Sequence, residues 1–387
     1  MLHAPLRHTP RYRLLDAGRG IACLMVVVHH AGAALLKEDL GGSTLRGWIA
    51  LIFERANLGV TIFFVISGYC IAASADATRR TGFSPRTFLA RRFRRIYPPY
   101  WASILATLAL VVALDLAGLS WLHQGRHAVG IDSPGKLTAA QWVGNVTLTE
   151  TIRDHFGGPD RNLFTVVAWS LCYEEQFYFL VFLALAIAPR RLFPILVAIT
   201  AASGAMALGA RLTDEWGRVY GLFPALWHDF AVGVAVYYRL NRATRAWARR
   251  LLEGLILALA IGSVALVSSV DALLAASFGL LLIAASPFDE ALASKRFLAP
   301  LMACGHRSYS IYLVHLPIVG LVALGMVAMG LTSYGARLGL VVPISSVLGV
   351  AFGWLFFGGI EARFLNPPLP RARKKAVVVE PLQSHQA

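Results

Sequence analysis

The chain comprises 387 residues, of which 57% are hydrophobic and only 15% are charged, and its formal net charge is +15 at pH 7. This composition excludes an ordinary soluble protein, because several apolar runs reach the ~20 residues that an α-helix needs to cross a bilayer. The positive charge does not indicate a nucleic-acid partner, since the basic residues gather in short segments between apolar runs, as the positive-inside rule describes.

The sequence therefore predicts an all-α polytopic integral membrane protein with about ten transmembrane helices. The expected spans are 14–36, 57–75, 99–118, 165–188, 192–210, 222–238, 251–268, 270–286, 303–329 and 338–360. With the N-terminus in the cytoplasm, most Lys and Arg residues fall on the inner side, which predicts that both termini are cytoplasmic. The transmembrane region, 14–362, is then flanked by basic cytoplasmic tails at 1–13 and 363–387.

The first span, 14–36, carries ionisable residues within its apolar run, including Arg19, His29 and His30. Arg19 and His30 are eleven residues apart, which at roughly 100° per residue is close to three full turns. The two side chains therefore share one face of a helix, separated by roughly 16 Å along its axis. Ionisable groups at this depth are costly and normally face the protein interior, so this face is a candidate functional site. His29 points about 100° away from it.

Ser67 and Gly68 lie near the middle of the second span. Such small residues indicate close helix packing or, alternatively, close approach of the backbone to a ligand. The following segment reads FLARRFRRIYPPYW, and its two prolines fit the start of the third span at about residue 98. Arg92 and Arg95 in this segment either retain the loop inside and bind anionic lipid or bind the phosphates of a cytosolic ligand.

A long loop, 119–164, is expected on the outer side, and loops of this length are often functional. Its Trp121 and Trp142 could stack on a sugar or anchor the loop at the membrane interface. The fourth span, 165–188, contains the adjacent carboxylates Glu174 and Glu175, of which at most one readily faces a narrow site.

The ninth span contains His315, which is expected at about the depth of His30. Two histidines and a carboxylate at similar depth favour a functional site over isolated buried polar groups. The four cysteines show neither the spacing of a metal site nor that of a disulfide framework, so the sequence predicts neither.

Taken together, these segments resemble the acyltransferase 3 family of integral membrane acyltransferases, over residues 12–368. The resemblance rests on LDAGRGIACLMVVVHH, GVTIFFVISGYCIA, FLARRFRRIYPPYW, WSLCYEEQFYFL, GHRSYSIYLVHLPI and FFGGIEARFLNPP. The family's Arg-ten-residues-His motif falls on Arg19 and His30, and its Arg-x-x-Arg motif falls on Arg92 and Arg95. Its Glu-Glu-Gln motif falls on Glu174, Glu175 and Gln176.

The resemblance implies transfer of an acyl group, usually acetyl, from cytosolic acyl-CoA to a hydroxyl of a saccharide or glycolipid, such as an envelope polysaccharide or exopolysaccharide. It further implies a location in the bacterial cell inner membrane, contact with membrane lipid, and possible partners in envelope-polysaccharide assembly. No metal cofactor is expected. The alternative from another class is a secondary transporter or flippase for a saccharide or lipid.

The expected mechanism places the phosphates of acyl-CoA at Arg92, Arg95 and Arg19, and the thioester near His30. His30 acts as the general base on the acceptor hydroxyl, with Glu175 orienting its imidazole. Hydrogen-bond donors to the oxyanion are then expected from His315, Ser67 or Tyr69. An acyl-histidine intermediate on the same residues is a rival chemistry.

Overall fold

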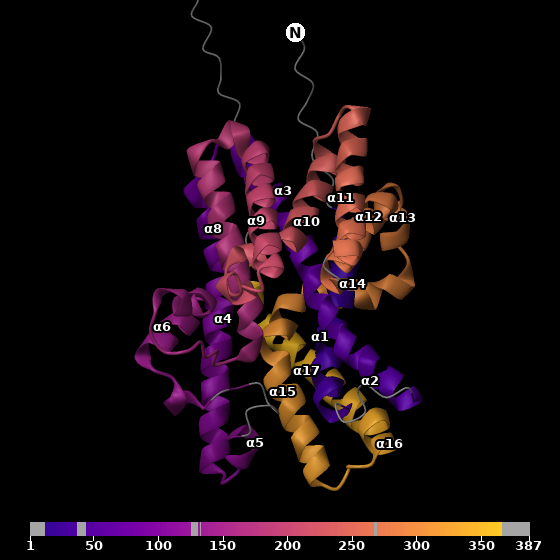
Figure 1. Ribbon diagram of the computed structural model, residues 1–387. Helices are drawn as coiled ribbons and strands as arrows, with labels where there is room; N and C mark the ends of the chain where they lie inside the picture. The colour runs from indigo at the N-terminus through magenta and orange to yellow at the C-terminus, as the bar shows by residue number, and fades with distance from the viewer. Residues whose placement is uncertain (1–11, 37–43, 125–130, 132, 267–268, 366–387) are drawn as a thin grey trace, which may run out of the picture.

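The computed structural model describes residues 12–36, 44–124, 131, 133–266 and 269–365, and within them the chain is almost entirely helical. This confirms the prediction of an all-α polytopic membrane protein (Figure 1). The basic tails expected at 1–13 and 363–387 fall mostly outside the described residues.

The longer helices are α1 Leu14–Leu36, α2 Leu45–Arg55, α3 Gly59–Thr81, α4 Pro85–Leu116, α8 Trp169–Ile187, α9 Leu192–Leu212, α10 Trp227–Asn241, α11 Ala246–Leu266, α12 Val270–Ala285, α14 Ala299–His306, α15 Ser308–Ala328 and α17 Val342–Gly359. Short helices are α5 Trp121–Gln124, α6 Ala139–Val146, α7 Glu150–Arg153, α13 Asp289–Ala293 and α16 Tyr334–Ala336.

By length and composition, eight helical segments of the described chain could span a membrane. They coincide with eight of the ten expected spans, and the other two segments differ for separate reasons. Helix α10 has only 15 residues, about 22 Å, which is short for a ~30 Å hydrocarbon core. Helix α11 is long enough, but Arg249, Arg250 and Glu253 lie in its first half and interrupt its apolar surface.

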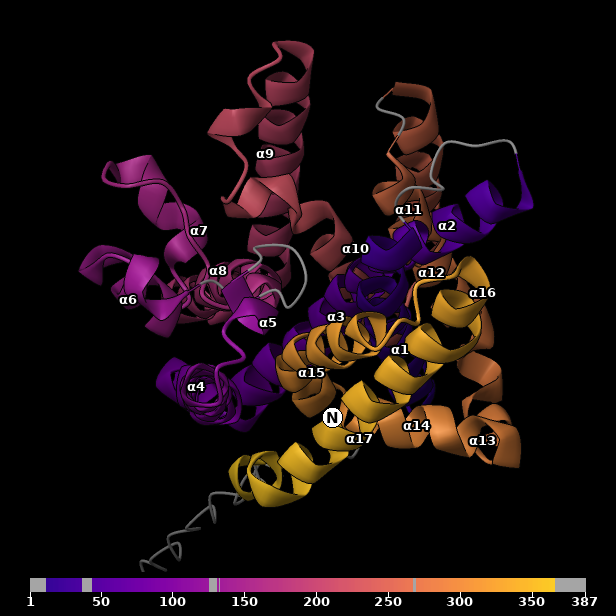
Figure 2. The ribbon, with the colours of Figure 1, turned by 90° about the horizontal axis from the view of Figure 1, so that it is seen from below.

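Helix α1 lies in the middle of the bundle, where it packs against α3, α14, α15 and α17 (Figure 2). Its contact with α14 is close because small residues face each other there. A Cβ at Gly20 would lie 1.9 Å from the carbonyl oxygen of Leu301, and one at Gly305 would lie 1.7 Å from that of Asp16. Small residues at such contacts are how membrane helices bring their backbones together.

The third expected span begins earlier than the sequence indicated. Helix α4 starts at Pro85, where the hydroxyl of Ser84 accepts a hydrogen bond from the backbone N–H of Arg86, and Pro98 and Pro99 lie inside it. The expectation that this proline pair starts the helix is therefore wrong. The missing N–H groups of Pro98 and Pro99 leave the carbonyls of Arg94 and Arg95 without their helical donors. The Tyr309 hydroxyl donates to the next carbonyl along the helix, that of Ile96 (2.9 Å).

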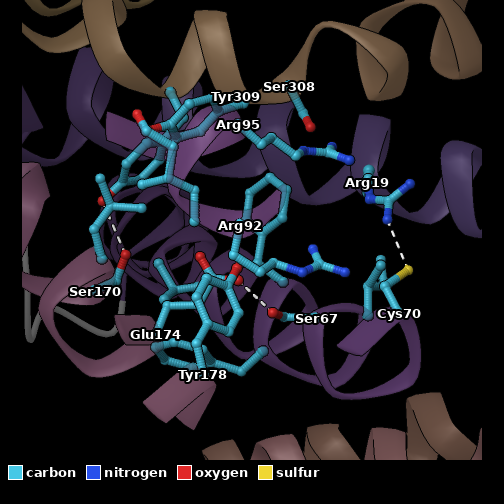
Figure 3. A pocket seen from close by; sticks show the side chains of 17 residues that line it. Arg19, Ser67, Cys70, Arg92, Arg95, Ser170, Glu174, Tyr178, Ser308 and Tyr309 are labelled. Carbon is cyan, nitrogen blue, oxygen red and sulfur yellow. Dashed lines mark hydrogen bonds between the residues drawn. The ribbon is translucent and has the colours of Figure 1, made fainter. Parts of the chain in front are cut away.

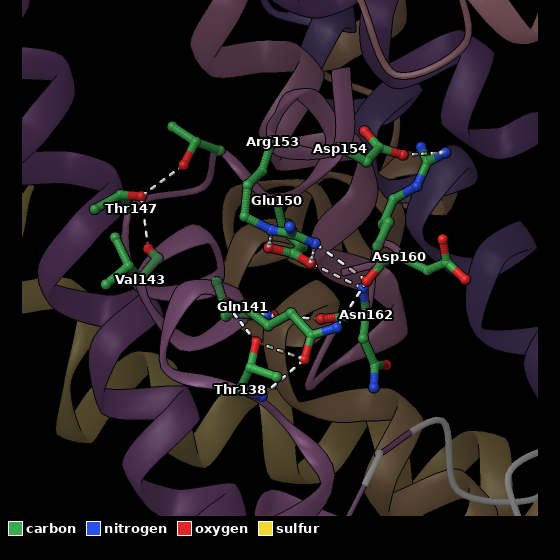
Figure 4. Close-up of polar contacts among 12 residues, drawn as sticks. Thr138, Gln141, Val143, Thr147, Glu150, Arg153, Asp154, Asp160 and Asn162 are labelled. Carbon is green, nitrogen blue, oxygen red and sulfur yellow. Dashed lines mark hydrogen bonds and ion pairs between the residues drawn. The ribbon is translucent and has the colours of Figure 1, made fainter. Parts of the chain in front are cut away.

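The long loop 119–164 contains ordered short helices in its described part (Figure 4). Helix α6 begins with a capping box between Thr138 and Gln141. Glu150 of α7 is fully buried and accepts hydrogen bonds from Arg153 (2.8 Å) and from the backbone N–H of Asn162 (2.8 Å). These contacts close the segment into a compact unit, which packs alongside α4.

Candidate active site

A cavity of about 190 Å³, called here the main cavity, lies between α1, α3, α4, α8 and α15 (Figure 3). Its polar lining residues are Arg19, Ser67, Cys70, Arg92, Arg95, Ser170, Glu174, Tyr178, Ser308, Tyr309 and Tyr312. The three guanidinium groups approach it from one side, and Ser170 lies on the opposite side. Five of the sequence-derived candidates, from four different helices, therefore meet at one cavity.

A second cavity of about 330 Å³, called here the basic cavity, shares Arg19, Arg92 and Arg95 with the main cavity. Arg91 and His306 also line it. The shared residues, the arginine cluster, therefore stand where the two cavities meet. Because Arg92 and Arg95 are three residues apart on a helix rather than in a loop, their side chains share one face.

Asp16 and Cys70 hold Arg19 of the arginine cluster in place, and the carboxyl of Glu361 lies near Arg95. Arg19 donates to the carboxylate of Asp16 (2.8 Å) and to the sulfur of Cys70 (2.9 Å). Glu361, beyond α17, accepts from the backbone N–H of Ser310 (3.0 Å). Burial raises the pKa of Glu361, whereas its hydrogen bonds to Ser310 and the positive charge of Arg95 act in the opposite direction.

The two adjacent carboxylates of α8 point to different places, as their 100° separation predicts. Glu174 lines the main cavity and accepts a hydrogen bond from the hydroxyl of Ser67. Glu175 lies beside Tyr97 of α4, and its Oε1 atom is buried without a hydrogen-bond partner among the described residues. No hydrogen bond joins Glu175 to His30 in the described part of the chain, so the geometry brings Glu174, not Glu175, to the cavity.

His30 and His315 lie in direct contact, from α1 and α15. The Nδ1 atom of His30 is 3.1 Å from Nε2 of His315 and 2.9 Å from the carbonyl oxygen of Val26. His315 is fully buried. The Nδ1 atom of His29 instead faces the carbonyl oxygen of Phe53 (3.0 Å). The two histidines expected at similar depth therefore form a pair, and His29 is directed elsewhere.

Tyr312 separates the histidine pair from the main cavity. It lines the cavity, its ring lies 6.2 Å from that of His315, and its hydroxyl contacts Ser170 (2.8 Å) and the carbonyl of Val167. Neither His30 nor His315 lines either of the two cavities. Tyr312 is therefore a lining residue of the main cavity that also neighbours His315.

Three of the expected residues lie away from this region. Tyr69 is buried in an aromatic cluster with Tyr12 and Tyr237, and its hydroxyl accepts a hydrogen bond from Asn241 (3.2 Å). Trp121 is exposed on α5, and Trp142 packs on Phe164 with ring centroids 5.1 Å apart. The structure thus gives none of the three a place in the cavity lining.

Several lining residues were not predicted from the sequence, namely Cys70, Arg91, Tyr178, His306 and Tyr312. Helical spacing could have found two of them. Cys70 follows Ser67 by three residues and Tyr312 precedes His315 by three, so each shares a helix face with a residue already chosen.

The comparisons with known proteins agree with this architecture. A family model described as an acyltransferase domain matches residues 12–358. The chain is 30% identical over 233 residues to BcsY of Komagataeibacter xylinus, a proposed membrane-bound transacylase, covering 59% of this chain and 51% of that one. It is 24% identical over 413 residues to the O-acetyltransferase OatA of Staphylococcus aureus, covering 98% and 60%.

A third relative is the peptidoglycan O-acetyltransferase OatA of Listeria monocytogenes, 28% identical over 352 residues, with 82% of this chain and 51% of that one covered. The chain thus spans about half the length of these curated relatives. No solved structure matches it.

Proposed function

The chain belongs to the acyltransferase family whose model covers residues 12–358, and we propose that it transfers an acyl group from cytosolic acyl-CoA to a saccharide hydroxyl. Acetyl is the acyl group that we propose. The observation that carries this proposal is the placement of the arginine cluster and of the histidine pair relative to the main cavity. The arginine cluster lines this cavity, and so does Tyr312, whose ring lies 6.2 Å from that of His315 in the histidine pair.

The donor site is the two cavities together. Guanidinium groups bind phosphate in a bidentate manner, and the cluster joins a basic cavity to one with many apolar and aromatic lining atoms. Acyl-CoA combines several phosphates with a long thiol arm, so the phosphates bind at Arg19, Arg92 and Arg95. The arm then runs along α1 over the roughly 16 Å between Arg19 and His30.

Ser67 and Glu174 belong to this donor site rather than to the reacting centre. On α3, a Cβ at Gly59 would meet Ala22 and Val26 of α1, and the neighbour of Ser67, Ile66, faces Gly18. Ser67 is therefore level with the Arg19 end of α1, far from His30. The Ser67–Glu174 pair hydrogen-bonds the arm as it passes. The Tyr312 hydroxyl donates its single proton to the carbonyl of Val167, so it offers no donor to the oxyanion while that hydrogen bond holds.

The reaction is direct transfer with His30 as general base. His30 takes the proton of the acceptor hydroxyl, whose oxygen attacks the thioester carbonyl, and the C–S bond breaks to release a thiolate. The proton then passes from His30 to that thiolate, so the imidazole returns to its neutral form. A positioned general base contributes about 10²–10⁴-fold, and holding the reactants together out of bulk water contributes further.

Two of the relatives are named as O-acetyltransferases, one of them of peptidoglycan, and these names support a saccharide acceptor. We assign a saccharide or saccharide-containing acceptor that approaches from the outer side, with Trp121 and Trp142 as candidates for stacking on it. The location is the bacterial inner membrane with both termini cytoplasmic, and envelope-polysaccharide assembly proteins are the expected partners.

The test is incubation of membranes that contain the protein with labelled acetyl-CoA, followed by identification of the labelled product. We expect an O-acetylated saccharide, and no product with the His30→Ala variant at equal expression. Label trapped on His30 without acceptor would replace direct transfer by an acyl-histidine intermediate. Movement of a saccharide across liposomes without consumption of acetyl-CoA would contradict the proposal and favour a transporter.

A further inference from the structure

Both ring nitrogens of His315 have fixed neighbours, and those neighbours determine where its proton lies. Its Nδ1 atom is 2.9 Å from the carbonyl oxygen of Tyr312 and 3.0 Å from that of Ile311. Carbonyl oxygens only accept hydrogen bonds, so Nδ1 must carry a proton. In the neutral imidazole the Nε2 atom of His315 is then a hydrogen-bond acceptor.

The neighbours of His30 determine the position of its proton in the same way. Its Nδ1 atom faces two acceptors, the carbonyl oxygen of Val26 and the Nε2 atom of His315. Nδ1 of His30 must therefore be protonated, which leaves its Nε2 atom with a free lone pair. The tautomers of both rings follow from the positions of their hydrogen-bond partners, the usual basis for such assignments.

We propose that His315 is a positioning residue, which accepts a hydrogen bond from Nδ1–H of His30 and so presents Nε2 of His30 as the base. This rests on the proposed function, in which His30 takes the proton of the acceptor. It also changes the role expected for His315 from the sequence. A neutral His315 has its single N–H committed to backbone carbonyls, so it has no proton to give to an oxyanion.

The surroundings of His315 keep its ring in place. It is fully buried, and α17 passes closely because Gly349 faces it, where a Cβ would lie 3.5 Å from Cβ of His315 and 2.8 Å from Val319. An acceptor held this firmly orients the imidazole of His30 before substrate binds. When Nε2 of His30 takes the proton, the hydrogen bond to His315 becomes charge-assisted and therefore stronger.

The test compares His315→Phe, which removes the acceptor, with His315→Gln, whose amide can accept from His30 and donate to the backbone. We expect His315→Phe to lower kcat about 10- to 100-fold, the range of a hydrogen bond to a charged group, with KM for acetyl-CoA unchanged. His315→Gln should recover part of kcat. Leu316→Ala, a buried change on the same helix, controls for packing and should leave kcat within a few-fold of wild type.

The second readout is spectroscopic and needs no activity. In wild-type protein labelled with ¹⁵N-histidine, we expect His30 protonated at Nδ1 and a through-hydrogen-bond ¹⁵N–¹⁵N coupling to His315. A His30 protonated at Nε2, or a His315→Phe variant with wild-type kcat, would overturn the proposal. Equal losses in all three variants would assign His315 a packing role instead. An active His30→Ala would refute the proposed base while leaving the tautomer result intact, so the two failures are distinguishable.

Discussion

Adjacent residues on one helix can have unrelated roles, and the two neighbouring histidines of α1 show how. His30 faces α15 and His315, whereas His29 faces the carbonyl of Phe53 in α2. The cause is the 100° turn between successive positions, which directs the two rings to different neighbours. The choice of base between them therefore depends on which neighbouring helix each ring faces.

The first prediction compares His29→Ala with His30→Ala at equal expression. Because a general base contributes about 10²–10⁴-fold, His30→Ala should lower labelled acetyl transfer by that factor. His29→Ala should retain most of the activity, since it removes the contact with the Phe53 carbonyl and the edge-to-face contact with the His30 ring (centroids 5.0 Å) but leaves the proposed base in place. The assay is transfer of label from acetyl-CoA to the acceptor. Loss of activity in His29→Ala alone would reverse the assignment of the base.

The second prediction concerns donor affinity. Arg92→Gln and Arg95→Gln should each raise KM for acetyl-CoA about tenfold, because each removes a charged hydrogen bond to phosphate that solvent partly screens. Arg94→Gln is the matched control. Arg94 lies on the same helix, but it donates to the carbonyl of Arg363 (3.3 Å) and lines neither cavity. A similar rise in KM for all three would indicate a general charge effect instead of a phosphate site.

At the scale of elements, helix packing explains why the site has its shape. Helices α3 and α10 cross through two glycines, each against the partner's backbone. A Cβ at Gly68 would lie 2.0 Å from the carbonyl oxygen of Phe230, and one at Gly233 would lie 1.9 Å from that of Val65. Since Ser67 precedes Gly68, this contact also fixes the rotation of α3 that presents Ser67 to the main cavity.

The third prediction tests this contact with Gly68→Ala, which should destabilise the protein by about 1–3 kcal/mol through overpacking. Gly254→Ala in α11 is the control, because nothing lies within 4 Å of a Cβ there. That change should be neutral or slightly stabilising, since Ala favours a helix over Gly by about 1 kcal/mol. The measurement is the thermal unfolding midpoint in detergent. Equal midpoints for the two variants would show that the close contact does not limit stability.

The sequence was informative about elements where apolar runs were long, and less so where helix ends or rotations mattered. Residues 14–36 were predicted as a helix with the bounds that α1 has. The start of α4 was not predicted, although Ser84 followed by Pro85 is a favourable helix start, because the later pair Pro98 and Pro99 also fits a helix start. A proline pair inside a helix is tolerated only when tertiary neighbours compensate, and a single sequence does not show those neighbours.

The same limit applies to the candidate site. Arg19, Arg92, Arg95, Ser67 and Glu174 were each chosen from depth, charge or motif, and the fold brings all five to the lining of one cavity. They could not decide between Glu174 and Glu175, because the rotation of α8 about its axis depends on its packing against α3 and α4. The position of Tyr69 in an aromatic cluster was missed for the same reason.

At the scale of the whole molecule, the arginine cluster lies near the end of the bundle that the distribution of Lys and Arg assigns to the cytoplasm. The cluster lies beside the start of α1 and in the first third of α4, and both places adjoin segments that the Lys and Arg bias assigns to the cytoplasm. The arginine cluster, the proposed phosphate site, would then lie on the side that supplies acyl-CoA, and the proposed acceptor would reach His30 from the other side.

The fourth prediction follows from this sidedness. In sealed inside-out membrane vesicles, externally added labelled acetyl-CoA should support transfer, whereas sealed right-side-out vesicles should show little until they are permeabilised, because CoA phosphates do not cross a bilayer. Protease accessibility of tags at both termini gives the orientation independently. Equal transfer in both sealed preparations would contradict a donor site that is accessible from the cytoplasm alone. Transfer in right-side-out vesicles only would place the donor site on the outer face and would require the helix orientation to be reversed.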